Sequence, residues 1–351
     1  MIIINARFLT QPITGVQRFA IEISKELVQL KYPVVFVAPS NIIHKDLAKL
    51  LNVVILPGLQ GHFWEQISLP FYVLRKRGLL VSLCNLAPLI LKKQIIAIHD
   101  LSALKHPEWF SKAFNNFYRF VIPILAKRAR HIITVSETSK KELIDYLKIF
   151  ENKISVVHNA VFNIGTSMCP SVNKEDYILT VSSHNPRKNF ERLIKAFNLI
   201  ENKKIRLIVV GNFSDNFKET NFKFEDHLNE RVEFLTNIDD AELITYYQKA
   251  KLFVFPSLYE GYGIPVLEAI MCETECLVSD IPVFKEIYKD SVNYFNPKSV
   301  SSITEQINNS LNNPKTIKET LVIKKKMDLK FSWSKSAIKI ISIINFNYET
   351  I

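Results

Sequence analysis

Short apolar runs alternate with longer segments of helical periodicity along most of this 351-residue chain. An apolar run without polar alternation is typical of a strand buried on both faces, and such strands form parallel sheets covered by helices. The alternation therefore predicts an α/β fold. In the first half the expected strands are 1–4, 34–38, 53–56, 95–98 and 131–135, and the expected helices are 16–30, 112–130 and 138–148.

The same alternation restarts after residue 170, which indicates a second sheet. A segment rich in Gly, Thr, Ser and Pro, Asn163–Asn173, separates the two series. The chain length also suits two domains. We expect two Rossmann-like domains, 1–168 and 169–332, whose parallel sheets face a cleft, followed by an amphipathic segment, 333–351. In the second half the expected strands are 178–182, 205–210, 232–235, 252–255 and 275–278, and the expected helices are 189–199, 240–250 and 265–272.

The net charge of +11 is confined to the first half of the chain. Residues 1–170 hold 21 Lys and Arg but only 10 Asp and Glu, whereas residues 171–351 hold 24 of each. A basic half beside a neutral half indicates a surface that faces anions: phospholipid, nucleic acid or a phosphorylated substrate.

Four cysteines in a chain of this length form no disulfide framework, so the chain resembles a reduced, cytosolic protein, with Cys272 and Cys276 in the core.

Met1–Asn5 lacks a basic leader and runs directly into a strand pattern, so no export signal is expected. The uncharged, mostly apolar run Gly78–Leu91 has 14 residues and basic flanks. It is shorter than the ~20 residues that span a bilayer. Any membrane contact is therefore expected at the surface.

Only eight glycines occur in the chain, so their positions are informative. Gly211 follows one expected strand, and Gly261 and Gly263 follow another. Ligands bind at the carboxyl ends of strands in open α/β sheets, and a missing Cβ permits close approach of the backbone to a ligand. Ordinary tight turns are the alternative explanation for these three positions.

The segment Phe255–Ala269 carries the strongest chemical pattern. Pro265 suits the first turn of a helix, so the free amides around Gly263 to Leu267 are expected to face a bound phosphate. Glu260 and Glu268 would accept hydrogen bonds from hydroxyls on either side of a diphosphate, Glu260 from the transferred sugar and Glu268 from the ribose. Alternatively, Glu268 is a favourable first-turn acid and Glu260 a surface loop residue.

A second pattern, Ser182–Asn189, lies between an expected strand and a helix. Its adjacent cations, Arg187 and Lys188, are well placed to neutralise a diphosphate. A solvated basic loop is the alternative, and His184 is interpreted as a polar loop residue.

His99 and Asp100 leave an expected strand of the first half, where Asp100 would orient the imidazole ring. A helix-capping aspartate beside a satisfied histidine is the alternative. Gly15, after the first strand, would place a turn and a helix start at the floor of the same cleft.

Several motifs are absent. The sequence contains no G-x-G-x-x-G, no P-loop motif and no D-x-D, which disfavours a P-loop NTPase and a metal-dependent nucleotide-sugar fold. It also lacks G-x-S-x-G, which excludes the nucleophile elbow of a hydrolase.

The segment from Glu260 to Glu268 resembles the E-x7-E element of retaining glycosyltransferases of family 4, which have the GT-B fold. The order of the patterns agrees with that family from residue 1 to about 340. A tryptophan-containing segment also resembles members that build bacterial surface polysaccharides. The segments that carry the resemblance are Thr14–Phe19, Trp64–Gln66, Leu69–Pro70, Cys84–Asn85, Ile98–Asp100, Asn185–Asn189 and Glu260–Glu268.

The resemblance implies a retaining, metal-independent transfer of a hexose from a nucleotide-diphosphate sugar, with no other cofactor. The segment 333–351 would pack back on the first domain. Many relatives carry Gly-Arg where this chain has Ser182-Ser183, so Arg187 or backbone amides would substitute for that arginine. His99, Lys188 and Glu260 would be catalytic, and Asn85 and Asp100 would bind the acceptor. The donor would be bound by Gly15, Arg187, Lys188, Gly211, Glu260, Gly261, Tyr262, Gly263, Ile264 and Glu268.

The expected acceptor is a lipid-linked oligosaccharide of O-antigen or surface-polysaccharide synthesis. The enzyme would then be cytoplasmic and bound peripherally to the anionic inner face of the cytoplasmic membrane, without a nucleic-acid partner. GDP-mannose is the first donor to consider, with dTDP-rhamnose and UDP sugars as alternatives. Two other classes stay open: a nucleotide-sugar epimerase, which needs no acceptor, and a basic nucleic-acid-binding protein, which would bind with steep salt dependence.

Overall fold

The computed structural model describes residues 1–161, 173–183, 185–211 and 230–349. The chain divides into two compact units. Unit 1 comprises Met1–Leu104, Asn115–Ala160 and Ser332–Ile351, and unit 2 comprises Lys105–Phe114 and Val161–Phe331. Most of the expected boundary, Asn163–Asn173, lies outside the described residues.

Unit 1 is built on a seven-stranded parallel sheet with the order β3-β2-β1-β4-β5-β6-β7. The expected α/β architecture is therefore confirmed. Its strands are β1 (Ile2–Asn5), β2 (Val34–Ala38), β3 (Val54–Ile55), β4 (Leu79–Ser82), β5 (Gln94–Ala97), β6 (His131–Thr134) and β7 (Ile154–Val156).

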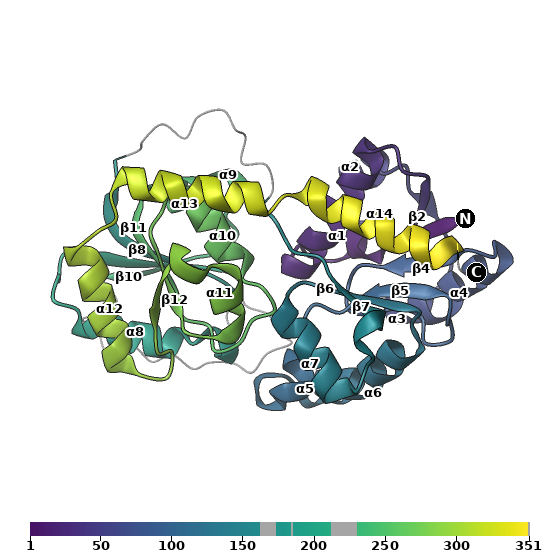
Figure 1. The fold of residues 1–351 in the computed structure, drawn as a ribbon, viewed down its shortest axis with the longest axis horizontal. Coiled ribbons are helices and arrows are strands. Elements are labelled where there is room, and N and C mark those ends of the chain that lie inside the picture. The colour runs from purple at the N-terminus through teal and green to yellow at the C-terminus, as the bar shows by residue number, and fades with distance from the viewer. Residues whose placement is uncertain (162–172, 184, 212–229, 350–351) are drawn as a thin grey trace. The chain divides into compact units, whose positions relative to one another are not determined.

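Helices cover both faces of this sheet, with α1 and α14 on one side and α6 and α7 on the other (Figure 1). The last helix, α14, packs against α1, and Trp333 meets the Phe19 ring edge-on at 6.0 Å. The helices are α1 (Gly15–Gln29), α2 (Lys45–Leu50), α3 (Gly61–Phe63), a π-helical turn (Trp64–Ser68), α4 (Leu69–Arg75), α5 (Ser102–Lys105), α6 (Lys112–Arg128), α7 (Glu137–Leu147) and α14 (Trp333–Glu349).

Unit 2 contains a six-stranded parallel sheet with the order β10-β9-β8-β11-β12-β13. Its strands are β8 (Glu175–Val181), β9 (Arg206–Val210), β10 (Val232–Leu235), β11 (Ala250–Phe255), β12 (Cys276–Ser279) and β13 (Asn293–Phe295). Helices lie on both faces of this sheet as well (Figure 1). They are α8 (Phe190–Leu199), α9 (Asp240–Lys249), α10 (Ile264–Met271), α11 (Pro282–Ile287), α12 (Val300–Asn312) and α13 (Ile317–Lys330).

Local sequence explains where several of these helices begin. Ser136 caps α7 by accepting the amide of Ser139, as its position before an apolar series predicts. Asp239 and Glu242 form a reciprocal capping box at the start of α9. Each cap satisfies amide donors that the first helical turn leaves without an intrahelical partner.

Strands β7 and β13 were not predicted from the sequence, and neither was β4. It occupies part of the uncharged run Gly78–Leu91 and lies beside β1 at the centre of the sheet, with all four of its residues buried. Among the described residues no helix has the length and apolar character needed to cross a bilayer. Cys272 and Cys276 are buried free thiols, as expected of small core residues.

Candidate active site

Most donor residues expected in the second half follow the carboxyl ends of β8 and β11, which are adjacent strands of unit 2, and Gly211 follows β9, the other neighbour of β8. In a parallel sheet these ends share one edge, which is where open α/β sheets bind ligands. Two loops meet there, because the amide of Leu258 donates to the carbonyl of Arg187 at 2.7 Å. The site is therefore assembled from segments about 70 residues apart in sequence.

Asn185 and Asn189 hold the loop that carries Lys188. Asn185 accepts the amide of Arg187, which starts a short 3-10 turn over Pro186–Lys188. Asn189 ends this turn in the left-handed conformation (φ 61°), and its amide group donates to the carbonyls of Pro256 and Pro297. Both asparagines are buried, so this loop is tied to the loop after β11 before any ligand arrives.

Lys188 and Glu260 form a buried ion pair. The ammonium donates to Oε1 of Glu260, and the two side chains are each 8% exposed. The ammonium also lies 5.2 Å from the centroid of the Phe255 ring. The sequence predicts that these residues bind different parts of one donor, and in the structure they contact each other. A buried pair of this kind presents both a cation and a carboxylate at the strand ends.

The turn before α10 depends on a glycine. Gly263 has a φ of +94°, and a Cβ there would lie 2.6 Å from the Phe284 ring. Its carbonyl accepts the Tyr288 hydroxyl and also the amide of Val266. The Val266 amide is therefore engaged within the turn, which corrects the expectation that it faces a phosphate.

Glu268 lies in the second turn of α10, because the helix begins at Ile264 and its first turn holds no acidic residue. This corrects the expected first-turn position. The buried Glu268 carboxylate accepts the Tyr247 hydroxyl at 2.9 Å. Burial, and next the charge of Glu268, raise the pKa of Tyr247 well above its usual value, so the hydroxyl stays protonated and donates. Tyr247 lies on α9, and no local pattern pointed to it.

The remaining donor candidates differ in burial and in what surrounds them. Arg187 is half-buried, whereas Gly261 and Tyr262 are buried in the loop before α10 and Ile264 is buried at its first position. A Cβ on Gly211 would lie 1.6 Å from the carbonyl oxygen of Ser182, so the chain's own backbone already requires this glycine. His184 lies outside the described residues.

In unit 1 the His99 ring is held by backbone. Its Nε2 lies 2.9 Å from the carbonyl oxygen of Leu83, and its main-chain amide donates to Oδ1 of Asn85. Burial lowers the pKa of His99 below its usual value, which keeps the ring neutral. A neutral ring that donates through Nε2 carries its lone pair on Nδ1.

Asp100 accepts the amide and the hydroxyl of Ser102, the first residue of α5. The hydrogen bond that orients the His99 ring comes from Leu83 rather than from Asp100, contrary to the expectation. Gly15 is the exposed first residue of α1. Gly15, Asn85, His99 and Asp100 thus belong to unit 1, whereas the other candidates belong to unit 2.

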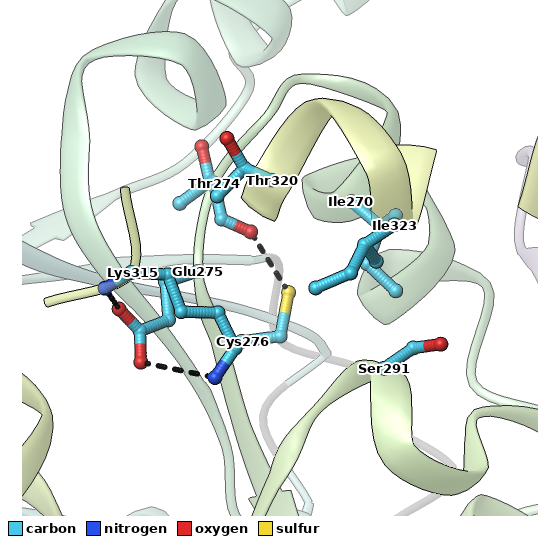
Figure 2. Close-up of a pocket in the computed structure, with 8 residues that line it drawn as sticks. All are labelled: Ile270, Thr274, Glu275, Cys276, Ser291, Lys315, Thr320 and Ile323. Atoms are coloured by element: carbon cyan, nitrogen blue, oxygen red, sulfur yellow. Dashed lines mark hydrogen bonds and ion pairs between the residues drawn. The ribbon is translucent and has the colours of Figure 1, made fainter. Parts of the chain in front are cut away.

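A small pocket in unit 2 lies on the side of the sheet where the strands begin, beside the amino end of β12 (Figure 2). In this pocket Glu275 contacts Lys315 and Asn293. The pocket has a volume of about 10 Å³, so it has room for one water at most. This pocket is a packing feature. Among the described residues no group of three or more His, Cys, Asp or Glu side chains is arranged to hold a metal ion.

Solved structures with this fold cover almost the whole chain. HepE of Anabaena, solved in complex with UDP and glucose, has a TM-score of 0.74, is 16% identical, and aligns over 98% of this chain and 99% of its own. WaaG, a glycosyltransferase involved in lipopolysaccharide biosynthesis, has a TM-score of 0.73 and is 14% identical over 98% of this chain and 99% of its own. The fold is that of the GT-B glycosyltransferases.

Sequence comparison identifies the family. Residues 13–161 match the family described as Glycosyltransferase Family 4, and residues 170–326 match the one described as Glycosyl transferases group 1. The chain therefore belongs to the family 4 type of GT-B glycosyltransferases, as its motifs indicated.

The curated relatives include enzymes of O-antigen synthesis. The O-antigen chain mannosyltransferase RfbU of Salmonella typhimurium is 32% identical over 220 residues, which is 63% of this chain and 61% of the relative. The serotype-specific mannosyltransferase WbdA of Escherichia coli is 27% identical over 264 residues, 70% of this chain and 32% of the relative. The aligned part thus spans less than two thirds of each of these relatives.

Proposed function

We propose that this chain is a retaining glycosyltransferase that moves a hexose from a nucleotide-diphosphate sugar, GDP-mannose first, to a lipid-linked oligosaccharide in O-antigen synthesis. The observation that carries the proposal is the buried Lys188–Glu260 pair beside the Gly263 turn, at the ligand-binding edge of unit 2. The mannosyltransferase relatives support mannose as the transferred sugar.

Lys188 would stabilise the departing diphosphate. As the bond between the sugar carbon and the phosphate oxygen breaks, negative charge grows on that oxygen, and a preorganised ammonium in a water-poor site stabilises it. Arg187, on the same turn, would add a second cation. With these cations and the backbone at the start of α10, the reaction would need no metal ion.

Glu260 would bind hydroxyls of the transferred sugar, and Glu268 those of the ribose. Donor binding would then place the diphosphate against Lys188 while Glu260 remains hydrogen-bonded on its sugar side. The acceptor oxygen would attack from the face that the diphosphate leaves, and the acceptor proton would pass to the departing phosphate oxygen. Retention of configuration follows from this same-face displacement.

His99, Asn85 and Asp100 would serve the acceptor and the sugar from unit 1. Because the ring is neutral and held through Leu83, His99 can accept a hydrogen bond at Nδ1 and orient a hydroxyl. It would act as an orienting residue rather than as the sole base.

An anionic membrane surface is the proposed location of the enzyme. Four side chains of the helical segment 61–75 form an apolar stripe, and each is 57–71% exposed: Phe63, Ile67, Phe71 and Leu74. Exposed Arg75, Lys76 and Arg77 follow directly. The ring of His62, in α3, lies 5.2 Å from that of Phe117 on α6, where Phe120 is also exposed. Apolar side chains with adjacent cations suit the interface of an anionic bilayer.

The aromatic and basic stretch 109–130 contributes little to this surface. Trp109 and Phe110 are buried, and only Phe117 and Phe120 among its large apolar side chains are exposed.

The test of the proposed function has two stages. GDP, UDP and dTDP sugars are first screened for thermal stabilisation of the full chain, since a ligand of the folded state raises its stability. The stabilising donor is then assayed for transfer to lipid-linked acceptors, with and without EDTA, and the anomeric configuration of the product is determined. Transfer with retention that survives EDTA is expected. Release of an epimerised sugar nucleotide without acceptor would contradict the proposal.

A further inference from the structure

A second buried ion pair lies in unit 1, at the carboxyl end of β1. The Nε of Arg7 is 3.3 Å from Oε1 of Glu65, and the same oxygen accepts the side-chain amide of Asn5 at 2.7 Å. The Arg7 main-chain amide donates to Oδ1 of Asn5. Arg7 is 7% exposed and Glu65 is 1% exposed.

This pair is costly to maintain as a purely structural element. Two charges removed from water lose hydration that their mutual attraction rarely repays, and apolar residues of similar size often stabilise such a position better. Burial alone would raise the pKa of Glu65, but the neighbouring His62, Arg7 and Asn5 lower it below its usual value. Glu65 is therefore ionised, and the buried charge requires an explanation.

Glu65 sits in the π-helical turn Trp64–Ser68. Its neighbours have structural partners: the Trp64 indole donates to the carbonyl of Leu56, and the Gln66 side chain bonds the main chain of Ala87 and Leu89. π-Helical turns occur frequently at functional sites. Here Glu65, the one charged residue of the turn, contacts Arg7.

The pair shares the ligand-binding edge of its sheet with the proposed acceptor residues. The ends of β1 and β4 are joined there, because the Asn5 amide also donates to the Ser82 hydroxyl. The charges of Arg7 and Glu65 act on the Cys84 thiol, whose pKa burial raises to about 12. Cys84 precedes Asn85, which binds the main chain of His99.

Both partners keep hydrogen-bonding capacity. Oε2 of Glu65 is buried without a hydrogen-bond partner, and Nδ1 of half-exposed His62 lies 3.7 Å from it. Within the described residues the Arg7 side chain makes no ion pair or hydrogen bond besides the contact from Nε to Glu65. Its two terminal amino groups are thus free to donate.

We infer that Arg7 and Glu65 form a subsite for hydroxyl groups of the acceptor carbohydrate, with Arg7 as the binding residue and Glu65 as its positioning residue. This inference rests on the proposed glycosyl transfer. A hydroxyl group both donates and accepts hydrogen bonds, and so matches an arginine fork beside a carboxylate. A phosphate fits less well, because the charge of Glu65 offsets that of Arg7 and repels an anion.

The test measures binding of methyl glycosides of mannose, glucose, galactose, rhamnose and N-acetylglucosamine by saturation-transfer NMR. The full chain is saturated with the nucleoside diphosphate that stabilises it. At least one glycoside is expected to bind. Arg7→Lys and Glu65→Gln should each weaken that glycoside about tenfold or more, because a charge-assisted hydrogen bond or its alignment is lost. The affinity for the nucleotide should not change.

Two further variants separate binding from folding. The paired replacement Arg7→Met with Glu65→Met leaves no lone buried charge, so it should fold and lose glycoside binding. Lys153→Met removes a cation before β7, at the opposite edge of the same sheet, and should bind the glycoside normally.

Three outcomes would overturn the inference: equal glycoside affinity in the folded variants, no glycoside binding by a wild-type chain that binds nucleotide, or displacement of the glycoside by inorganic phosphate. A wild-type chain that binds no nucleotide and transfers no sugar would instead overturn the proposed function.

Discussion

Lys188 and Glu260 form an ion pair, so each side chain holds the other in position. A lysine has three donors, and an ammonium already paired with Glu260 can still meet a diphosphate oxygen. Donor binding then needs no large rearrangement of the loop, because Asn185 and Asn189 already fix its backbone. Preorganisation of this kind is what electrostatic stabilisation of a transition state requires.

Lys188→Ala is expected to lower kcat by ~10²–10³, the scale for loss of one preorganised electrostatic contact. It should also weaken the free nucleoside diphosphate, because the ammonium meets the phosphates in both states. Transfer rates and calorimetric titration measure the two effects. Lys195→Ala is the matched control, since Lys195 forms an exposed ion pair with Glu191 on α8. Unchanged kcat in Lys188→Ala would contradict the assigned role.

Glu260→Gln is expected to reduce transfer while the free nucleoside diphosphate binds at least as tightly as to the wild type. The amide keeps the size of the side chain but no longer neutralises the Lys188 charge, which then acts fully on the phosphates. Calorimetry of the sugar-free nucleotide, paired with transfer rates, distinguishes the roles. Loss of nucleotide affinity in this variant would mean that the placement of the donor is reversed.

At the scale of elements, irregular turns position side chains in each unit. The turn at Gly263 starts α10 close to Phe284 and Tyr288, and the π-helical turn presents Glu65 inward while the stripe from Phe63 to Leu74 stays exposed. Both features depend on backbone conformations outside the regular helix and strand.

Gly263→Ala is expected to destabilise the chain by about 2–4 kcal/mol, from left-handed backbone strain together with the clash against Phe284. Gly61→Ala serves as the control, because Gly61 also has a positive φ (57°) but no atom lies within 4 Å of its added Cβ. Gly61→Ala should lower the free energy of unfolding by only about 1 kcal/mol. Denaturant unfolding measures the stability of both variants. Equal losses of stability would show that the contact with Phe284 is not the cause.

The apolar stripe predicts membrane binding that is both apolar and electrostatic. Phe71→Ser with Leu74→Ser should lower partitioning onto anionic vesicles at least about tenfold, since each large apolar side chain contributes ~1.5–3 kcal/mol when buried. Phe150→Ser, at another exposed aromatic residue of unit 1, should have little effect. Co-sedimentation with anionic and neutral vesicles at low and high salt measures this. Equal binding to both vesicle types would reject the anionic-surface proposal.

At the scale of the whole molecule, stability should decline in mild acid. Burial lowers the pKa of His131 to about 4, and its Nε2 lies 2.8 Å from the Ser155 hydroxyl. The unfolded chain takes up this proton below about pH 6.5, whereas the folded chain does so only near pH 4, so stability is full above this window and falls through it.

The loss attributable to His131 should be about 2–3 kcal/mol between pH 6.5 and 4. Thermal unfolding of the wild type and of His131→Gln across this range tests it. The variant should show a flatter dependence on pH. Parallel curves would assign the acid sensitivity to other groups.

Much of the fold and of the donor site could be predicted from local sequence. Buried parallel strands are continuous apolar runs, and this pattern identified most of both sheets. Lys188, Glu260 and Gly263 were recognisable because each follows an expected strand, within a loop whose residue types suit a diphosphate. Such signals are local, and a parallel sheet brings all carboxyl ends to one edge.

Only the tertiary structure decided which side chains are partners. The Lys188–Glu260 and Arg7–Glu65 pairs join residues 72 and 58 positions apart, and Tyr247 reaches Glu268 from another helix. The π-helical turn was also missed, because its sequence has neither a distinctive period nor a cap, and β4 was missed although Leu79–Val81 is an apolar run, because it lies within the longer uncharged run Gly78–Leu91. Local propensity and spacing determine where an element or a loop ends, whereas the pairing of buried charges depends on packing between segments distant in the chain.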